Sequence, residues 1–324
     1  MNIVYVSNEN YVRHLAVSVV SLLENNEAEE EIKIYVISTG ISELSKTKLN
    51  KLVHSYQREI EILNLADLKD RFDYPIDTGK FDISIMGRLF VGELLPEEVE
   101  RVLYLDCDTV VCKNLHKLYT MDLDGKILGA AMEPTINPEI REDAGIAMDA
   151  PYFNSGVLLS DLKKWRQKNA RNRVLYYHET IERRSLFSDQ DAINGALRWE
   201  IKIIDPQYNF FSNYRYWKYE ELVKMSKVYR LIPKKMYERA MKHPSIVHFA
   251  GDERPWLVGN RNYYRKVYQK YKKLTPWADR KDIPGKRMYM YAYHGMNVLT
   301  LISPWARRQI STWYIQGQIK KKGN

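Results

Sequence analysis

Two aspartates one residue apart follow a short apolar run in RVLYLDCDTVV, residues 101–111. Isolated carboxylates are costly to remove from water unless a positive group meets them. The two-residue period of a strand would direct Asp106 and Asp108 to the same side. Two carboxylates on one face suit a hard divalent cation, and the pyrophosphate of a sugar nucleotide would complete its ligand shell.

A second group of such residues is HFAGDERPW, residues 248–256. His248 follows an apolar run, so it could reach the same cleft from another strand end. Gly251 would let the backbone approach a phosphate closely, and Arg254 would supply a permanent cation for phosphate oxygens. Two carboxylates with one imidazole favour Mn²⁺, with Mg²⁺ as the alternative, because imidazole is the softer ligand. The plain alternative is a core histidine and a loop arginine.

The acidic pair also allows two other interpretations. The aspartates could cap a turn or the next helix. The pattern D-x-D-x-[TV], completed by Val110, is also typical of haloacid-dehalogenase-type phosphatases, in which Asp106 would be the nucleophile and Asp108 the acid/base. That family places the motif on a first strand and needs a later G-D-x-x-x-D pair. Here the motif follows three strand–helix units, and GDERPW has Trp256 where an acid is required.

The elements that must position these residues can be predicted from apolar periodicity. Strands are expected within residues 3–6, 32–37, 60–63 and 102–105, and helices within 12–23, 42–52 and 86–96, with Ser42 as an N-cap. This alternation indicates an α/β fold with a parallel sheet and right-handed crossovers. Ligands of such sheets bind at the carboxyl ends of the strands. Residues 7–10, Thr39 and 106–108 would then line one cleft.

Composition favours a cytoplasmic location. The 324 residues include two cysteines, Cys107 and Cys112, which excludes a disulfide framework and favours a reducing compartment. Met1 is followed at once by an alternating apolar segment, unlike a signal peptide. No run reaches the roughly 20 apolar residues of a membrane-spanning helix.

Positive charge is concentrated at the C-terminus. Residues 277–324 carry nine Lys/Arg and two Asp, whereas the whole chain has a net charge of +9. We therefore divide the chain into a main domain, 1–276, and a basic aromatic segment, 277–324. Trp305, Trp313 and Tyr314 would lie at headgroup level on the inner face of the cell membrane, with the basic residues on anionic lipid. The alternative is a helical pair packed on the domain. Nucleic acid is not an expected partner, because the rest of the chain is near neutral and lacks a recognised module.

The sequence resembles glycosyltransferase family 8, the retaining GT-A group, over residues 1 to about 260. The markers occur in order: the NENY loop, GRLFVGELLP, YLDCD, YFNSGVLL, DQDAIN and HFAGDERPW. The resemblance implies a Rossmann-like, mixed but mostly parallel sheet flanked by helices, followed here by a basic helical tail. It also implies transfer of glucose or galactose from UDP-glucose or UDP-galactose to a cell-envelope glycan, a glycolipid or a glycoprotein.

Site residues carried over from the family fall into four groups. The metal ligands are Asp106, Asp108 and His248. The residues for uridine are Val6, Asn8, Asn10 and Tyr11, with Tyr11 stacking on uracil. The residues for the donor sugar and diphosphate are Arg88, Asp106, Cys107, Asn154, Ser155, Gly251 and Arg254. The catalytic residues, also in contact with the sugar, are Asp189 and Gln190.

Some of these residues also allow a purely structural interpretation, and some positions differ from the family pattern. Asn154 could be a turn former, Tyr11 a core residue, and Asp189 and Gln190 first-turn residues that complement a helix dipole. Asn8 stands where many relatives have Asp, Arg254 replaces the usual Lys, and Met86 stands where Tyr commonly precedes the arginine.

The mechanism expected from these residues is front-face attack with retention of configuration. A neutral amide such as that of Gln190 is a poor covalent nucleophile. The departing phosphate oxygen would accept the acceptor's proton, and Gln190 would stabilise the developing cation. The alternative function is that of a non-catalytic UDP-sugar-binding protein.

Overall fold

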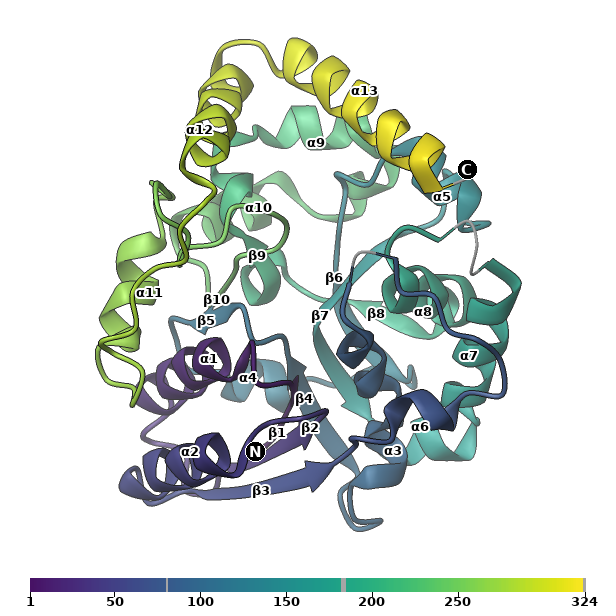
Figure 1. Cartoon of the computed structure of the whole chain (residues 1–324). Coiled ribbons are helices and arrows are strands. Elements are labelled where there is room, and N and C mark those ends of the chain that lie inside the picture. The colour runs from purple at the N-terminus through teal and green to yellow at the C-terminus, as the bar shows by residue number, and fades with distance from the viewer. Residues whose placement is uncertain (80, 182–184, 323–324) are drawn as a thin grey trace.

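The computed structural model describes residues 1–79, 81–181 and 185–322 of the chain (Figure 1). Its main feature is a seven-stranded sheet in the order β3-β2-β1-β4-β7-β6-β8. The strands are β1 (Asn2–Ser7), β2 (Lys33–Ser38), β3 (Glu59–Asn64), β4 (Arg101–Leu105), β6 (Leu128–Met132), β7 (Phe153–Asp161) and β8 (Ile201–Ile203). The four strands predicted from apolar runs are therefore all present.

The strand directions confirm a mixed, mostly parallel sheet. Strands β3, β2, β1 and β4 run parallel to one another, and β8 runs parallel to β6. Strand β7 is antiparallel to both of its neighbours, β4 and β6. Because β1 and β2 end together at the pair Ser7 and Ser38, their carboxyl ends form one edge of the sheet. That edge is where the predicted site residues follow the strands.

Helices α1 (Val12–Asn25) and α2 (Glu43–Ser55) connect the first three strands, and α6 (Leu162–Gln167) and α8 (Ser188–Leu197) contact β7. The helical spacing predicted α1, whose apolar residues are buried. Ser42 is the N-cap of α2, as predicted, because its side chain accepts a hydrogen bond from the Ser45 N–H. The remaining helices of the main domain are α3 (Val91–Leu94), α4 (His116–Tyr119), α5 (Pro138–Asp143), α7 (Ala170–Ile181), α9 (Tyr219–Met225), α10 (Lys234–Lys242) and α11 (Arg265–Lys272).

The helix predicted within 86–96 differs in type. Residues Ile83–Phe90 form a 3₁₀ helix, and the α-helix α3 covers only the next turn. A Cβ added at Gly87 would lie 2.8 Å from a methyl group of Val6 in β1. Only glycine fits at this position without displacing β1. Further 3₁₀ turns are Leu68–Arg71, Arg198–Glu200, Pro206–Asn209, Ser212–Tyr216 and Lys227–Leu231.

A second, three-stranded sheet has the order β5-β10-β9 and contains β5 (Thr109–Val111), β9 (Phe210–Phe211) and β10 (Ile246–His248). Strand β10 is antiparallel to β5, with His248 opposite Thr109. The chain therefore leaves the main sheet at the end of β4 and enters the second sheet at β5. The acidic pair lies in the turn between the two sheets.

The C-terminal segment forms two helices, α12 (Arg287–Ile302) and α13 (Pro304–Lys322), drawn in yellow-green and yellow in Figure 1. Helix α12 packs on the main domain, where Met290, Asn297 and Thr300 are buried. Helix α13 extends toward α5, and Gln316 donates a hydrogen bond to Glu139. The division at residues 276 and 277 stays a prediction. Of the helices in the described ranges, none is long and apolar enough to cross a membrane.

Candidate functional site

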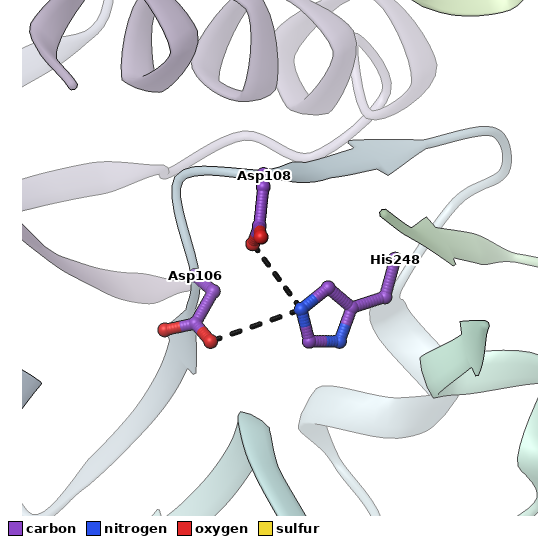
Figure 2. Close-up of side chains that lie close together, drawn as sticks. All are labelled: Asp106, Asp108 and His248. Carbon is purple, nitrogen blue, oxygen red and sulfur yellow. Dashed lines mark ion pairs between the residues drawn. The ribbon is translucent and has the colours of Figure 1, made fainter. Parts of the chain in front are cut away.

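Three predicted metal ligands converge between the two sheets. The carboxylates of Asp106 and Asp108 point toward the His248 ring (Figure 2), and one ligand atom from each residue lies within 4.8 Å of the other two. The His248 Nε2 atom is 3.2 Å from Asp108 Oδ1 and 3.8 Å from Asp106 Oδ2. Neither aspartate is in a strand, so the turn between β4 and β5 brings the carboxylates together. The strand alternation expected from the sequence is not the cause.

Hydrogen bonding fixes which His248 nitrogen faces the carboxylates. Its Nδ1 atom lies 2.8 Å from Asn209 Oδ1, while Asn209 Nδ2 donates to Asn154 Oδ1 at 2.8 Å, so the Asn209 oxygen is the acceptor. The Nδ1–H of His248 therefore donates to Asn209. Burial lowers the pKa of His248 despite the nearby carboxylates. The neutral ring then directs its Nε2 lone pair toward the two carboxylates. One imidazole nitrogen and two carboxylates form a donor set that fits a divalent cation.

Arg88 joins the metal site to the predicted sugar site. Its buried guanidinium is 3.1 Å from Asp106 Oδ1 and 3.0 Å from Asp189 Oδ2, and it donates to the Ser155 carbonyl oxygen at 2.6 Å. The ring of Tyr104 lies 4.7 Å from the guanidinium, and its hydroxyl donates to Asp106 Oδ1. One oxygen of Asp106 is thus occupied by Arg88 and Tyr104, which leaves the other to face His248.

Asp189 and Gln190, the predicted catalytic residues, lie in the first turn of α8. The plainer alternative, in which they complement the helix dipole, also places them there. Burial raises the pKa of Asp189 to about 6, against the opposing effect of Arg88. The Gln190 side-chain oxygen accepts hydrogen bonds from Asn154 Nδ2 at 2.7 Å and from the Ser155 N–H at 3.1 Å. The predicted residues of β7 and α8 are therefore held in one network with Arg88.

Glu133 is a site residue that the sequence analysis missed. It follows β6, and its Oε2 atom accepts hydrogen bonds from Asn154 Nδ2 at 3.0 Å and Gln190 Nε2 at 3.1 Å. Gln190 Nε2 also donates to the Tyr152 hydroxyl. Burial raises the pKa of Glu133 to about 7, although part of the residue is exposed to solvent. In the sequence, the signal that could have identified Glu133 is its position directly after the apolar run LGAAM.

The predicted phosphate residues lie beside the acidic pair. Gly251 has a φ of +80°, a left-handed conformation that favours glycine, and open space surrounds its Cβ position. Arg254 forms an ion pair with Asp108 and donates to the Phe249 carbonyl oxygen at 2.7 Å. The Phe249 N–H donates to the Asp108 carbonyl oxygen at 3.0 Å. This loop therefore carries a cation to the mouth of the metal site.

The predicted uridine loop lies at the end of β1, next to the acidic turn. The thiol of Cys107 donates to the Val6 carbonyl oxygen at 3.2 Å. Asn8 Oδ1 accepts from the Tyr11 N–H at 3.2 Å, and Asn10 is exposed. Tyr11 is 38% exposed, which makes a fully buried core role wrong, and its ring makes edge contacts with His14 and Trp256.

The site therefore combines three features at the rim of the sheet: a donor set that could hold a cation, two guanidinium groups paired with its aspartates, and a polar network. Such a site can neutralise developing negative charge on one side and position a polyhydroxyl ligand on the other.

Comparison with known families and proteins identifies the family of the chain. The model of the family described as glycosyl transferase family 8 matches residues 2–259. General stress protein A of Bacillus subtilis is 29% identical over 280 residues, covering 86% of this chain and 94% of that protein. Lipopolysaccharide 1,2-glucosyltransferase of Escherichia coli K12 is 26% identical over 289 residues, covering 86% of this chain and 79% of that protein.

Solved structures show the same fold. The galactosyltransferase LgtC, in complex with donor and acceptor sugar analogs, has a TM-score of 0.71 at 23% identity, covering 85% of this chain and 96% of that chain. Glycosyltransferase GlyE of Streptococcus pneumoniae TIGR4 has a TM-score of 0.61 at 22% identity, covering 92% of this chain and 64% of that chain. These neighbours establish a GT-A fold, as the sequence predicted.

Replacing Arg88 with Met should strongly destabilise the metal-free protein. The change removes the guanidinium that Asp106 and Asp189 share, so the two carboxylates are left without a positive partner. Removing one partner of a buried ion pair costs about 3–5 kcal/mol. Chemical denaturation measures the loss of unfolding free energy. Lys163→Met is the control, because its pair with Glu100 is exposed and we expect no measurable change. Equal stability of the two variants would show that Arg88 does not hold the acidic groups together.

Gly156→Ala should weaken binding of a divalent cation. A Cβ at Gly156 would lie 2.3 Å from His248 Cε1 and 2.8 Å from Asp106 Oδ2, so both side chains must move. Disturbing groups that orient metal ligands costs about 10–100-fold in affinity. Calorimetric titration with Mn²⁺ measures the effect. Gly295→Ala is the matched control, since nothing lies within 4 Å of that Cβ position. An unchanged Mn²⁺ affinity in Gly156→Ala would argue against a cation site here.

Proposed function

The chain belongs to glycosyl transferase family 8, and from this premise we propose that it is a metal-dependent, retaining hexosyltransferase. Its donor would be UDP-glucose or UDP-galactose, and its acceptor a cell-envelope glycan, a glycolipid or a glycoprotein. The observation that carries the proposal is the convergence of Asp106, Asp108 and His248, with a neutral imidazole nitrogen facing two carboxylates. Family membership removes the phosphatase alternative.

The donor diphosphate would bind across the acidic turn. A divalent cation held by Asp106, Asp108 and His248, with Mn²⁺ as the preferred ion, would offset the negative charge that develops on the leaving UDP. Arg254 would turn from Asp108 toward the phosphate oxygens, and Gly251 would allow their close approach to the backbone. Val6, Asn8, Asn10 and Tyr11 would hold uridine, with Tyr11 stacking on uracil.

The donor sugar would lie over the network of β7 and α8. Asn154, Ser155 and Asp189 would bind its hydroxyls, and Arg88 would keep Asp189 ionised and correctly placed. Gln190 would lie beside the anomeric carbon, where its amide stabilises positive charge as the glycosidic bond to UDP breaks.

The contacts of Gln190 support front-face attack over a covalent intermediate. Its carbonyl oxygen already accepts two hydrogen bonds, from Asn154 and Ser155, which lowers its power as a nucleophile. The carboxylate of Asp189 is held by Arg88. The acceptor hydroxyl would then attack from the side that UDP leaves and give its proton to the departing phosphate oxygen. A trapped glycosyl adduct on Asp189, Gln190 or Glu133 would reject this mechanism.

We further propose that the C-terminal helices contact anionic lipid, which places the enzyme on the cytoplasmic face of the cell membrane. Large apolar side chains of α13 are open to solvent, with Trp305 69% and Trp313 77% exposed. They accompany the positive charge of residues 277–324. Exposed tryptophans with basic neighbours are typical of an interfacial helix.

Release of UDP is the experiment that tests the proposed activity. With a panel of UDP-sugars, we expect UDP release that requires Mn²⁺ and favours glucose or galactose as the sugar. Asp108→Asn should reduce the rate below about a tenth of the wild-type rate, because losing a metal ligand removes several kcal/mol of stabilisation. Binding of UDP-sugar without release of UDP would indicate a non-catalytic protein. Full activity of Asp108→Asn would contradict the ligand role.

The lipid contact can be tested separately by sedimentation with vesicles. The double variant Trp305→Ser, Trp313→Ser should lose most binding to vesicles that contain phosphatidylglycerol, because the aromatic anchors are gone. Trp199→Ser is the matched control, since Trp199 is 66% exposed but lies far from the tail in the sequence. Unchanged binding of the double variant, or an equal loss in the control, would contradict a lipid contact through α13.

A further inference from the structure

The loop that carries Gly251 and Arg254 also has a side that faces away from the metal site. Glu253 lies between Asp252 and Arg254, and it is completely buried. Its side chain extends to α12 instead of the cleft. A buried carboxylate is costly unless it is hydrogen bonded. Burial raises the pKa of Glu253 to about 7, and among the described residues its Oε2 atom has no hydrogen-bond partner, so its polar contacts are made through Oε1.

Two side chains of α12 supply those partners. Asn297 Nδ2 donates to Glu253 Oε1 at 3.0 Å, and His294 Nδ1 lies 3.3 Å from the same oxygen. His294 Nε2 accepts a hydrogen bond from the Arg261 N–H at 2.7 Å, so its Nδ1 carries the proton and donates to Glu253. His294 therefore connects α12 to the loop at two points.

Other contacts attach the same loop to the start of α12. The Tyr289 hydroxyl donates to Asp252 Oδ2 at 2.8 Å. A Cβ at Gly259, whose φ is +90°, would lie 3.1 Å from Arg287 Cα, which shows how closely the two backbones approach. Just before the helix, the Ile283 N–H donates to the Trp256 carbonyl oxygen at 2.8 Å.

We propose that α12 is part of the diphosphate half of the donor site, with Glu253, His294 and Asn297 as positioning residues for Gly251 and Arg254. The inference rests on the proposed function. It goes beyond the family resemblance, because the matched region ends at residue 259, before α12 begins.

Further along, the same loop is fixed by Trp256, which is buried and stacks on His14, so the contacts with α12 bear on the part that carries Gly251 and Arg254. Gly251 has open space around it, and the contacts of Arg254 with Asp108 and Phe249 lie on the cleft side. When Arg254 turns toward phosphate, it gives up its pair with Asp108. The position of the loop then depends on the contacts behind it, which α12 provides. Loss of those contacts should affect the diphosphate more than the nucleoside, whose residues lie at the end of β1.

Asn297→Leu in the full-length chain tests the proposal. The change keeps an α12 side chain of similar size but removes the donor to Glu253. With Mn²⁺ present, we expect UDP affinity to fall about tenfold, the scale of one lost buried hydrogen bond. Uridine affinity should change by less than about twofold, because uridine has no phosphate to meet Arg254. Calorimetry measures both.

Three further variants serve as controls for this test. Thr300→Val is the matched control, since Thr300 is also buried in α12 but donates only within its helix, to the Met296 carbonyl oxygen. It should leave both affinities unchanged. Glu253→Gln should retain UDP binding to within about threefold, because its amide oxygen still accepts from Asn297. If Asn297→Leu does not fold, Tyr289→Phe removes only an exposed hydroxyl and should weaken UDP binding selectively.

Three results would overturn the inference. One is unchanged UDP affinity in the variant that folds, and another is an equal loss of UDP and uridine affinity. The third is the same UDP loss in Thr300→Val. Failure of the wild-type protein to bind UDP would overturn the proposed function itself, and this inference with it. If the wild-type protein binds UDP and the α12 variant binds it equally well, only the role of α12 is overturned.

Discussion

The structure depends on the balance of charge around a group of acidic side chains at the rim of the sheet. Asp106, Asp108 and Asp189 lie close together in a region where burial makes each negative charge costly. Arg88 pairs with the first and third, and Arg254 pairs with the second. A divalent cation between the carboxylates and the neutral His248 ring would complete this balance. The proposed binding of a charged donor would therefore draw on the same electrostatics that hold these side chains together.

Two sheets are needed to build this site. The main sheet brings the ends of β1, β4 and β7 to one edge, and the second sheet supplies His248 by pairing β10 with β5. The acidic turn is the point at which the chain passes from one sheet to the other. A small change in that turn would move both aspartates at once. A Cβ added at Gly156 would overlap His248 and Asp106, which shows how little space separates the two sheets here.

The polar networks have different origins on the two sides of the site. On the sugar side, Glu133, Asn154 and Gln190 hold one another through side-chain amides and a carboxylate. On the phosphate side, the backbone loop is attached from behind by α12. Both arrangements fix groups that would otherwise rotate freely, and fixed dipoles stabilise developing charge without reorganising. The tail segment thus combines a packed helix, α12, with an exposed one, α13.

The sequence by itself determined the first four parallel strands, the helices between the first three of them and the edge at which Asp106 and Asp108 lie, because apolar periodicity is a local property. Most of the other candidate site residues came from the family resemblance, and their roles stay predictions. Only the tertiary structure decided that a turn, and not strand alternation, brings Asp106 and Asp108 together. It also decided that Glu133 joins Gln190, and that α12 contacts the loop of Gly251 and Arg254. These contacts join segments far apart in the chain, and which buried groups meet depends on how two sheets and a distant helix pack.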